Sequence, residues 1–264
     1  MAPEQPTKIK AVFFDFMGTC LDWHGAVVAA TPAAVPRAAA SALALEWRRQ
    51  YFLSNAARHS AGLAPEDIDD TLARTLAQVL QQPAFAHLAS PSPSPSPSPS
   101  PSPSDTAQPG PLAAAAVQAH MVRAWHAQRA WPEVGAAITQ IRDGLGADVF
   151  VHANGTTRLQ LDLVRSSGLR GCFSMLFSSQ LLGVYKPHPE AYAKALQLVK
   201  LDPAEVVLVA AHAYDLRGAA AAGMKTVYVR RWTDDVDEDV EKLRTEFDAF
   251  LDGMEDLPDT IAGL

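Results

Sequence analysis

Asp15, which ends the first strand-like run of the chain, is the residue whose type and place most clearly suggest chemistry. Residues 12–14 are apolar, and the turn residues Gly18 and Thr19 follow, as expected of a buried strand that ends in a tight turn. A carboxylate at the carboxyl end of such a strand lies where open α/β sheets bind ligands. It can act as a nucleophile, forming an ester or acyl-phosphate that water later cleaves.

Other polar residues that could take part in chemistry follow later strand-like runs. They are Asn154 after residues 147–152, Lys186 in the segment 183–189, and His212 with Asp215 after residues 206–210. If the strand order brings these ends together, they meet in one crevice with Asp15. Lys186 would then keep Asp15 ionised, and Asp215 would orient either the lysine or a water molecule.

The elements that must position these residues alternate along the second half of the chain. Strands are predicted at residues 147–152, 175–177, 206–210 and 226–229, with helices at 157–167, 189–200 and 215–222. This alternation is typical of a parallel sheet flanked by helices, so the predicted fold class is α/β.

Strand signals vanish between Trp23 and about residue 129, and helices are predicted at 37–55, 64–82 and 112–128. The predicted organisation is a core of residues 1–23 and 131–264 with an inserted helical unit, 24–130. A Ser-Pro tract at about 89–111 lies in this unit and should be extended and solvated. It is interpreted as a tolerated loop expansion or as a cluster of phosphorylation sites or a docking tract.

Composition limits the partners and the compartment. The chain has 264 residues and a net charge of −7, and it shows no basic stripe that would bind nucleic acid. Neither a signal region nor an uninterrupted membrane-spanning run is recognised, and the two cysteines, Cys20 and Cys172, indicate no disulfide framework. We therefore expect a cytoplasmic protein. Cys20 is interpreted as a small buried hydrophobe or a reactive thiol. The acidic run 234–239 is interpreted as a solvated segment, with a role toward phosphate or a metal as the open alternative.

Three segments, FFDFMGT, VYKPHPEAY and HAYDLRGAAAAGMKTVYVRR, resemble in this order the haloacid dehalogenase superfamily, and most closely its type II L-2-haloacid dehalogenase branch. The resemblance implies a Rossmann-like, three-layer core with a parallel sheet, and a helical cap inserted after the first motif. It also implies a small-molecule 2-haloacid or related organic acid as substrate, with no metal or organic cofactor. Dimers are common in that branch, so a homodimer is an open alternative.

The resemblance assigns catalytic roles to three residues: Asp15 as nucleophile, Lys186 as the motif lysine, and Asp215 as the acid associated with the hydrolytic water. It assigns substrate or halide binding to further residues, namely Thr19, Arg48, Asn154, Tyr192 and His212. The implied reaction is displacement at C2 by the aspartate with inversion, followed by hydrolysis of the enzyme ester. Arg48 and Asn154 would receive the halide.

Several residues depart from the family pattern or have a second interpretation. Met17 replaces the second acid of phosphatases, and Ala153 and Ala210 replace hydroxyl residues. Arg48 could be a surface residue, with Arg49 facing inward, and Tyr192 could be core packing. His212 stands where a dehalogenase has asparagine, and is interpreted as a buried structural histidine, a donor or a base.

Two alternatives to the dehalogenase remain open. One is a phosphatase that acts on an unknown metabolite and depends on magnesium. The other is a catalytically weak protein of the same fold whose Ser-Pro tract recruits a partner.

Overall fold

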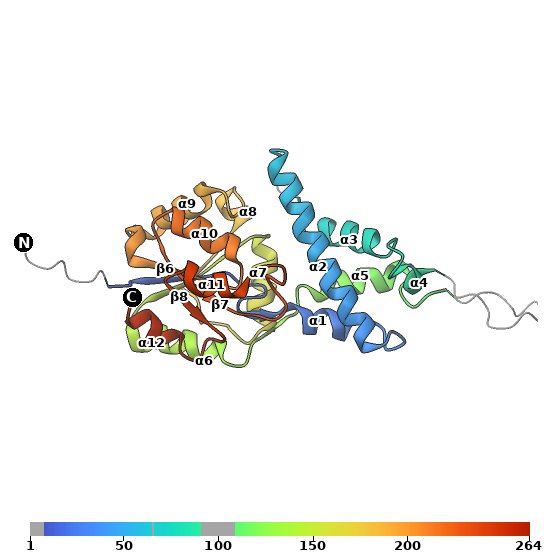
Figure 1. The fold of residues 1–264 in the computed structure, drawn as a ribbon, viewed down its shortest axis with the longest axis horizontal. Helices are drawn as coiled ribbons and strands as arrows, with labels where there is room; N and C mark the ends of the chain where they lie inside the picture. Colours follow the sequence, from blue (N-terminus) through green and yellow to red (C-terminus); the bar gives the residue numbers. More distant parts are fainter. Residues whose placement is uncertain (1–7, 65, 91–108) are drawn as a thin grey trace, which may run out of the picture. The chain divides into compact units, whose positions relative to one another are not determined.

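The computed structural model describes residues 8–64, 66–90 and 109–264 (Figure 1). The chain divides into two compact units, one formed by Met1–Trp23 with His126–Leu264 and the other by His24–Trp125. The Ser-Pro tract, with its alternative role in phosphorylation or docking, lies almost entirely outside the described residues. The interpretation of the helical unit as a cap stays a prediction.

A six-stranded parallel sheet forms the first unit. Its strands lie in the order β5 (Met175–Ser178), β4 (Asp148–Ala153), β1 (Ala11–Phe14), β6 (Val206–Ala210), β7 (Lys225–Val229) and β8 (Ala249–Leu251). Valine, phenylalanine and alanine dominate the central strands, and every residue of β1 and β6 is buried, as expected of a sheet covered on both faces. The predicted α/β fold with a parallel sheet is therefore confirmed.

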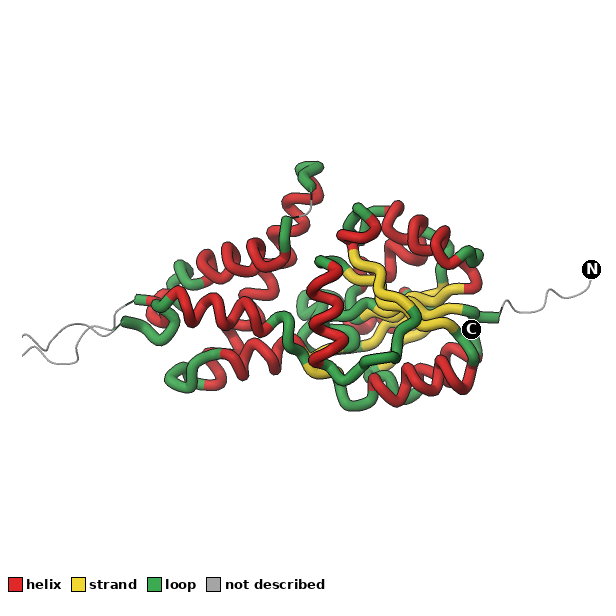
Figure 2. The backbone as a smooth tube through the Cα atoms, turned by 180° about the vertical axis from the view of Figure 1, so that it is seen from behind, coloured by secondary structure: helices red, strands yellow, loops and turns green. Residues whose placement is uncertain are grey.

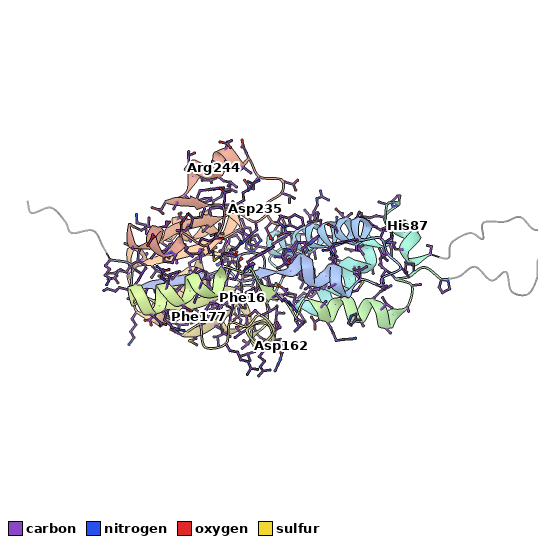
Figure 3. The ribbon with its side chains drawn as sticks, turned by 90° about the horizontal axis from the view of Figure 1, so that it is seen from below. Phe16, His87, Asp162, Phe177, Asp235 and Arg244 are labelled. Carbon is purple, nitrogen blue, oxygen red and sulfur yellow. The ribbon has the colours of Figure 1, made fainter. Side chains whose placement is uncertain are left out.

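Helices cover both faces of this sheet (Figures 1 and 2). They are α6 (Val134–Thr139), η1 (Gln140–Leu145), α7 (Thr157–Ser166), α8 (Ser179–Leu182), α9 (Pro189–Val199), η2 (Pro203–Glu205), α10 (Ala213–Ala221), α11 (Val240–Glu246) and α12 (Leu257–Ala262). Figure 1 shows α9 and α10 on one face, and α6 and α12 on the other. Between the sheet and α9, the rings of Phe13 and Phe150 pack edge to face at 5.4 Å, and both contact Phe177, labelled in Figure 3.

In the described residues of the second unit, all regular elements are helices. It contains α1 (Trp23–Ala30, which begins on the last residue of the first unit), α2 (Arg37–Ser60), α3 (Ile68–Val79), α4 (Ala86–Ala89) and α5 (Ala115–Ala124). Trp47 of α2 contacts α3 and the residue that follows α5: its Nε1 donates to the Leu72 carbonyl at 3.0 Å, and its ring meets that of Trp125 at 5.3 Å. None of the helices in the described ranges has the length and apolarity needed to cross a bilayer.

Three short strands were missed by the sequence prediction. The edge strand β8 has three half-buried residues, and β2 (Leu21–Asp22) pairs with β3 (Arg129–Ala130) over two residues each. Such short segments carry too little periodicity to be distinguished from a turn.

Strand register decides which residues meet at the carboxyl edge of the sheet. Phe14 of β1 is paired with Val151 of β4 on one side and with Val209 of β6 on the other. The next residue, Asp15, continues the ladder, because its N–H donates to the Val209 carbonyl at 3.0 Å. The loops that follow β1, β4 and β6 therefore begin side by side.

Packing of α10 against α9 leads to a stability prediction for Gly218. A Cβ at this position would lie 2.5 Å from the Tyr192 hydroxyl and 2.7 Å from two ring carbons. Helix propensity alone would make alanine stabilising by about 1 kcal/mol. We expect G218A instead to lower the free energy of unfolding by about 1–3 kcal/mol, because the buried ring must move.

Urea denaturation measures this change, and Gly135 in α6 is the matched control. A Cβ there would meet only Leu169 Cδ2 at 3.8 Å, so G135A should be neutral or stabilising. Equal effects of the two substitutions would contradict the packing argument.

Candidate active site

Asp15 lies at the centre of a buried hydrogen-bond network at the carboxyl edge of the sheet. Its Oδ1 accepts a hydrogen bond from Lys186 Nζ at 3.0 Å. Its Oδ2 accepts one from Thr19 Oγ1 at 2.7 Å and lies 3.0 Å from His212 Nδ1. Four of the residues singled out in the sequence thus converge, although they come from three separate segments of the chain.

Lys186 links Asp15 to a second acid. Its ammonium group, which is almost fully buried, donates to Asp15, to Asp215 Oδ2 and to the His152 carbonyl, the last at 2.6 Å. An ammonium carries three protons, so all three have acceptors. Burial alone would lower the pKa of Lys186, but Asp15 and Asp215 outweigh it and raise that pKa, so the side chain stays charged.

The two acids that share Lys186 differ in their tendency to bind a proton. Burial would raise the pKa of Asp15, but Lys186 and His212 together hold it well below its ordinary value, so Asp15 is an anion. Burial raises the pKa of Asp215, and the nearby lysine offsets only part of that effect. A permanently ionised acid beside one that binds a proton more readily is the arrangement that nucleophilic and acid–base roles require.

Asn154 and Tyr192 support the lysine and the second acid. The Asn154 amide accepts from the Lys186 backbone N–H at 2.8 Å and donates to the Lys186 carbonyl at 3.0 Å, fixing that segment. Tyr192 is fully buried on α9 and donates to Asp215 Oδ1 at 2.7 Å. Tyr192 thus both packs in the core and holds Asp215 through its hydroxyl. The substrate-contact roles of Asn154 and Tyr192 stay predictions.

Thr19 connects the loop that follows β1 to the end of β6. Its hydroxyl accepts from the Ala211 N–H at 2.8 Å and donates to Asp15 Oδ2. The turn that carries it is held by Trp131, whose Nε1 donates to the Gly18 carbonyl at 2.8 Å. The orientation of the threonine hydroxyl is therefore set by the Ala211 N–H on one side and the Asp15 carboxylate on the other.

His212 lies between two carboxylates. Its Nδ1 lies 3.0 Å from Asp15 Oδ2, and its Nε2 lies 3.0 Å from Asp234 Oδ1. Burial would lower the pKa of His212, but hydrogen bonds to Asp15 and Asp234 raise it to about 10. A pKa of about 10 argues against the interpretation of His212 as a base that titrates near neutral pH, because an imidazolium can only donate. Its role in binding substrate or halide stays a prediction.

Asp234 is the main site residue that sequence reasoning missed. It belongs to the acidic run 234–239, which charge patterning suggested to be solvated, yet its side chain is fully buried. The interpretation is wrong at Asp234 and holds for Asp237 and Asp239, which are exposed. Asp235, labelled in Figure 3, lies in the same loop after β7 and accepts from the Ala213 N–H at 2.6 Å.

Three of the positions that depart from the family pattern are apolar and buried. Met17, Ala153 and Ala210 are at most 8% exposed, so they add no side-chain oxygen or nitrogen around Asp15. Cys20 is also buried, and its Sγ donates to the Asp15 carbonyl at 3.4 Å. Burial raises the pKa of the Cys20 thiol, which fits a small buried side chain and argues against a reactive one.

Arg48 belongs to the second unit, where it is buried on α2 among aromatic rings. Its guanidinium lies 4.4 Å from the centre of the Phe52 ring and 5.5 Å from that of Trp125. It is thus a buried residue, whereas Arg49 is exposed. Its predicted role toward a halide stays a prediction.

The fold and these motifs define a class of protein. The model of the family described as haloacid dehalogenase-like hydrolase matches residues 9–223, and the chain belongs to this family. The resemblance stated from the three motifs is confirmed at that level.

Individual relatives are more distant. Haloacetate dehalogenase H-2 of Moraxella sp. (strain B) is 30% identical over 102 residues, 39% of this chain and 45% of that protein. (S)-2-haloacid dehalogenase 4A of Burkholderia cepacia is 24% identical over 226 residues, 84% of each chain. Glyceraldehyde 3-phosphate phosphatase of Methanopyrus kandleri is 32% identical over 127 residues, 47% of this chain and 54% of that one.

The match spans less than half the length of the first three curated relatives, with coverage of 45%, 48% and 44%. Among solved structures, L-2-haloacid dehalogenase from Xanthobacter autotrophicus superposes with a TM-score of 0.73 at 22% identity. That superposition covers 97% of this chain and 99% of the other. At 22% identity, this structural similarity shows that the two chains share a fold.

The two buried histidines of the site should carry different charges. Burial, aided by Lys186, lowers the pKa of His152 to about 3, whereas that of His212 is about 10. We expect ¹⁵N NMR of histidine-labelled protein to show His152 neutral and His212 doubly protonated from about pH 5 to about pH 8, although free histidine titrates within this range. H212N and H152N assign the signals, and a change of protonation at either residue in this window would contradict the prediction.

Proposed function

We propose that this chain is a (S)-2-haloacid dehalogenase that cleaves a carbon–halogen bond through an ester on Asp15. The observation that carries the proposal is the state of Asp15: it is buried, ionised and held by Lys186, Thr19 and His212 at the carboxyl edge of the sheet. The names of relatives such as the Burkholderia enzyme support the same reaction.

The contacts of Asp15 suggest which oxygen attacks. Among the described residues, Oδ2 faces two side-chain donors, Thr19 and His212, whereas Oδ1 faces one, Lys186. A carboxylate oxygen has two lone pairs, so Oδ1 keeps one for the substrate. Oδ1 attacks C2 opposite the halogen, the C–O bond forms as the carbon–halogen bond breaks, and the halogen leaves with the bonding electrons.

Hydrolysis of the ester regenerates the enzyme. Water attacks Cγ of Asp15, and the Cγ–Oδ1 bond then breaks, so that Oδ1 leaves as the hydroxyl oxygen of an (R)-2-hydroxy acid. The proton lost by water passes to Asp215, and Lys186 donates one to the departing oxygen. A proton then passes from Asp215 to Lys186, to which it is hydrogen-bonded, and both residues return to their starting protonation states. Asp15 then releases its remaining proton to solvent.

A phosphatase is the second candidate, because the relatives include a glyceraldehyde 3-phosphate phosphatase. That chemistry needs a metal ion to bridge carboxylate and phosphate. The donor set here fits a cation poorly: both oxygens of Asp15 already face positively charged groups, Lys186 and His212, and Met17 supplies no second acid. The observed residues therefore favour displacement at carbon over phosphoryl transfer.

The choice between these reactions can be tested with a panel of short 2-haloacids and phosphomonoesters, with and without magnesium. We expect halide release that does not depend on magnesium, and a fall of about 10⁴-fold or more in kcat for D15N, which removes the nucleophile. D259N, an exposed change on α12, should retain full activity. Magnesium-dependent phosphate release would favour the phosphatase, and release of neither product would favour the catalytically weak protein.

Isotope labelling distinguishes an ester intermediate from direct attack by water on C2. With enzyme in excess of a 2-haloacid in ¹⁸O-water, the first turnover should give a hydroxy acid without ¹⁸O, because its new oxygen comes from Asp15. Many turnovers should give labelled product, since water replaces the oxygen of Asp15 in each cycle. Mass spectrometry of the product measures the label. Labelled product in the first turnover would exclude the ester.

A further inference from the structure

The loop after β7 sends one buried carboxylate, Asp234, into the site from outside the three motifs. Its Oδ2 accepts hydrogen bonds from Trp23 Nε1 at 3.1 Å and Thr233 Oγ1 at 2.7 Å, and its Oδ1 lies 3.0 Å from His212 Nε2. Trp23 and His212, from distant segments, and the neighbouring Thr233 thus converge on a carboxylate more than two hundred residues from Asp15. A buried charge is stable only with such partners.

The first motif leaves space for this carboxylate. Gly18 has a φ of +89°, and a Cβ there would lie 2.6 Å from both oxygens of Asp234. Any other residue would meet both the strain of the left-handed backbone and a collision with the carboxylate. Glycine at position 18 is therefore needed both for the tight turn and for the close approach of Asp234.

The two carboxylates fix the state of His212 by geometry. Ionised carboxylate oxygens only accept hydrogen bonds, so both ring nitrogens must carry protons. The Nδ1 proton then points at Asp15 Oδ2, the oxygen that also accepts from Thr19.

We infer that Asp234 is a positioning residue that holds the His212 imidazolium against Asp15 Oδ2, so that His212 and Thr19 form the oxyanion hole for ester hydrolysis. The inference rests on the proposed function. It assigns the donors of Oδ2 to the second chemical step, and Asp234 acts on that step through His212.

The chemistry explains why a second carboxylate is needed. Once Oδ1 is alkylated, Asp15 is neutral and no longer supports the positive charge of His212, whereas Asp234, hydrogen-bonded to Nε2, still does. When water attacks Cγ, the electron pair of the carbonyl bond moves onto Oδ2, and Thr19 Oγ1 and His212 Nδ1 donate to that oxygen. The pair returns as the Cγ–Oδ1 bond breaks. Preorganised donors of this kind typically contribute about 10²–10³-fold each to kcat.

The substitution D234N keeps the shape of the side chain and removes its charge. In rapid-quench measurements with a 2-haloacid, we expect a halide burst of about one equivalent per enzyme, followed by turnover slowed about 10²–10³-fold. The Asp15 ester should accumulate and appear as a mass increase on its peptide. D237N, an exposed change in the same acidic run, should behave as wild type. Loss of the burst together with turnover, or unchanged turnover, would overturn the inference.

Two further measurements separate positioning from folding. In an H212N background, D234N should slow ester hydrolysis no further, because its effect passes through the histidine; additive effects would contradict this. Without substrate, the Nε2–H proton resonance of His212 should shift upfield in D234N, since the acceptor of its hydrogen bond changes from an anionic carboxylate to a neutral amide. An unchanged resonance would overturn the positioning role. This second measurement is independent of dehalogenase activity, so failure of the proposed function remains distinguishable from failure of the inference.

Discussion

The buried ion pair between Lys186 and Asp15 is the interaction on which the rest of the site depends. Both side chains are almost fully buried, and the attraction between them must offset a desolvation cost of several kcal/mol for each ion. Excellent geometry is therefore required. It is provided by Asn154, which fixes the lysine backbone, and by Asp215, which accepts a second ammonium proton.

The same ion pair explains which charged and polar groups surround it. An anionic Asp15 attracts the Thr19 hydroxyl and the His212 imidazolium, and the imidazolium in turn requires Asp234. Each partner is buried and each contact satisfies a group that would otherwise be costly to desolvate. The site is thus a chain of alternating charges running from Asp215 through Lys186, Asp15 and His212 to Asp234.

Much of this arrangement follows from the sequence. The strands that support Asp15, Asn154 and His212 are apolar runs with clear ends, and three motifs in order identify the fold. The strand order β4-β1-β6 could be expected only through the resemblance, because hydrophobic patterning does not specify which parallel strands are neighbours. The helical boundaries were close, with α2 running five residues beyond the predicted end at residue 55.

Asp234 and the charge of His212 could not be predicted, and for one physical reason. An acidic run indicates solvent exposure on average, but burial is decided residue by residue by long-range contacts such as that between Trp23 and Asp234. Gly18 carried a signal, since a glycine in a tight turn can mark a close approach by another group, but not which group approaches. The protonation of His212 depends on both carboxylates and becomes visible only when they are placed.

The hydroxyl of Thr19 has a consequence for how quickly the site can respond to a change of charge on Asp15. Because its oxygen accepts from the Ala211 N–H, its single proton has little choice but to point at Asp15. A hydroxyl is ordinarily a free rotor whose dipole must turn when charge appears nearby. Here that rotor is locked in advance, so under the proposed mechanism the dipole needs no reorientation as the charge on Asp15 disappears and returns.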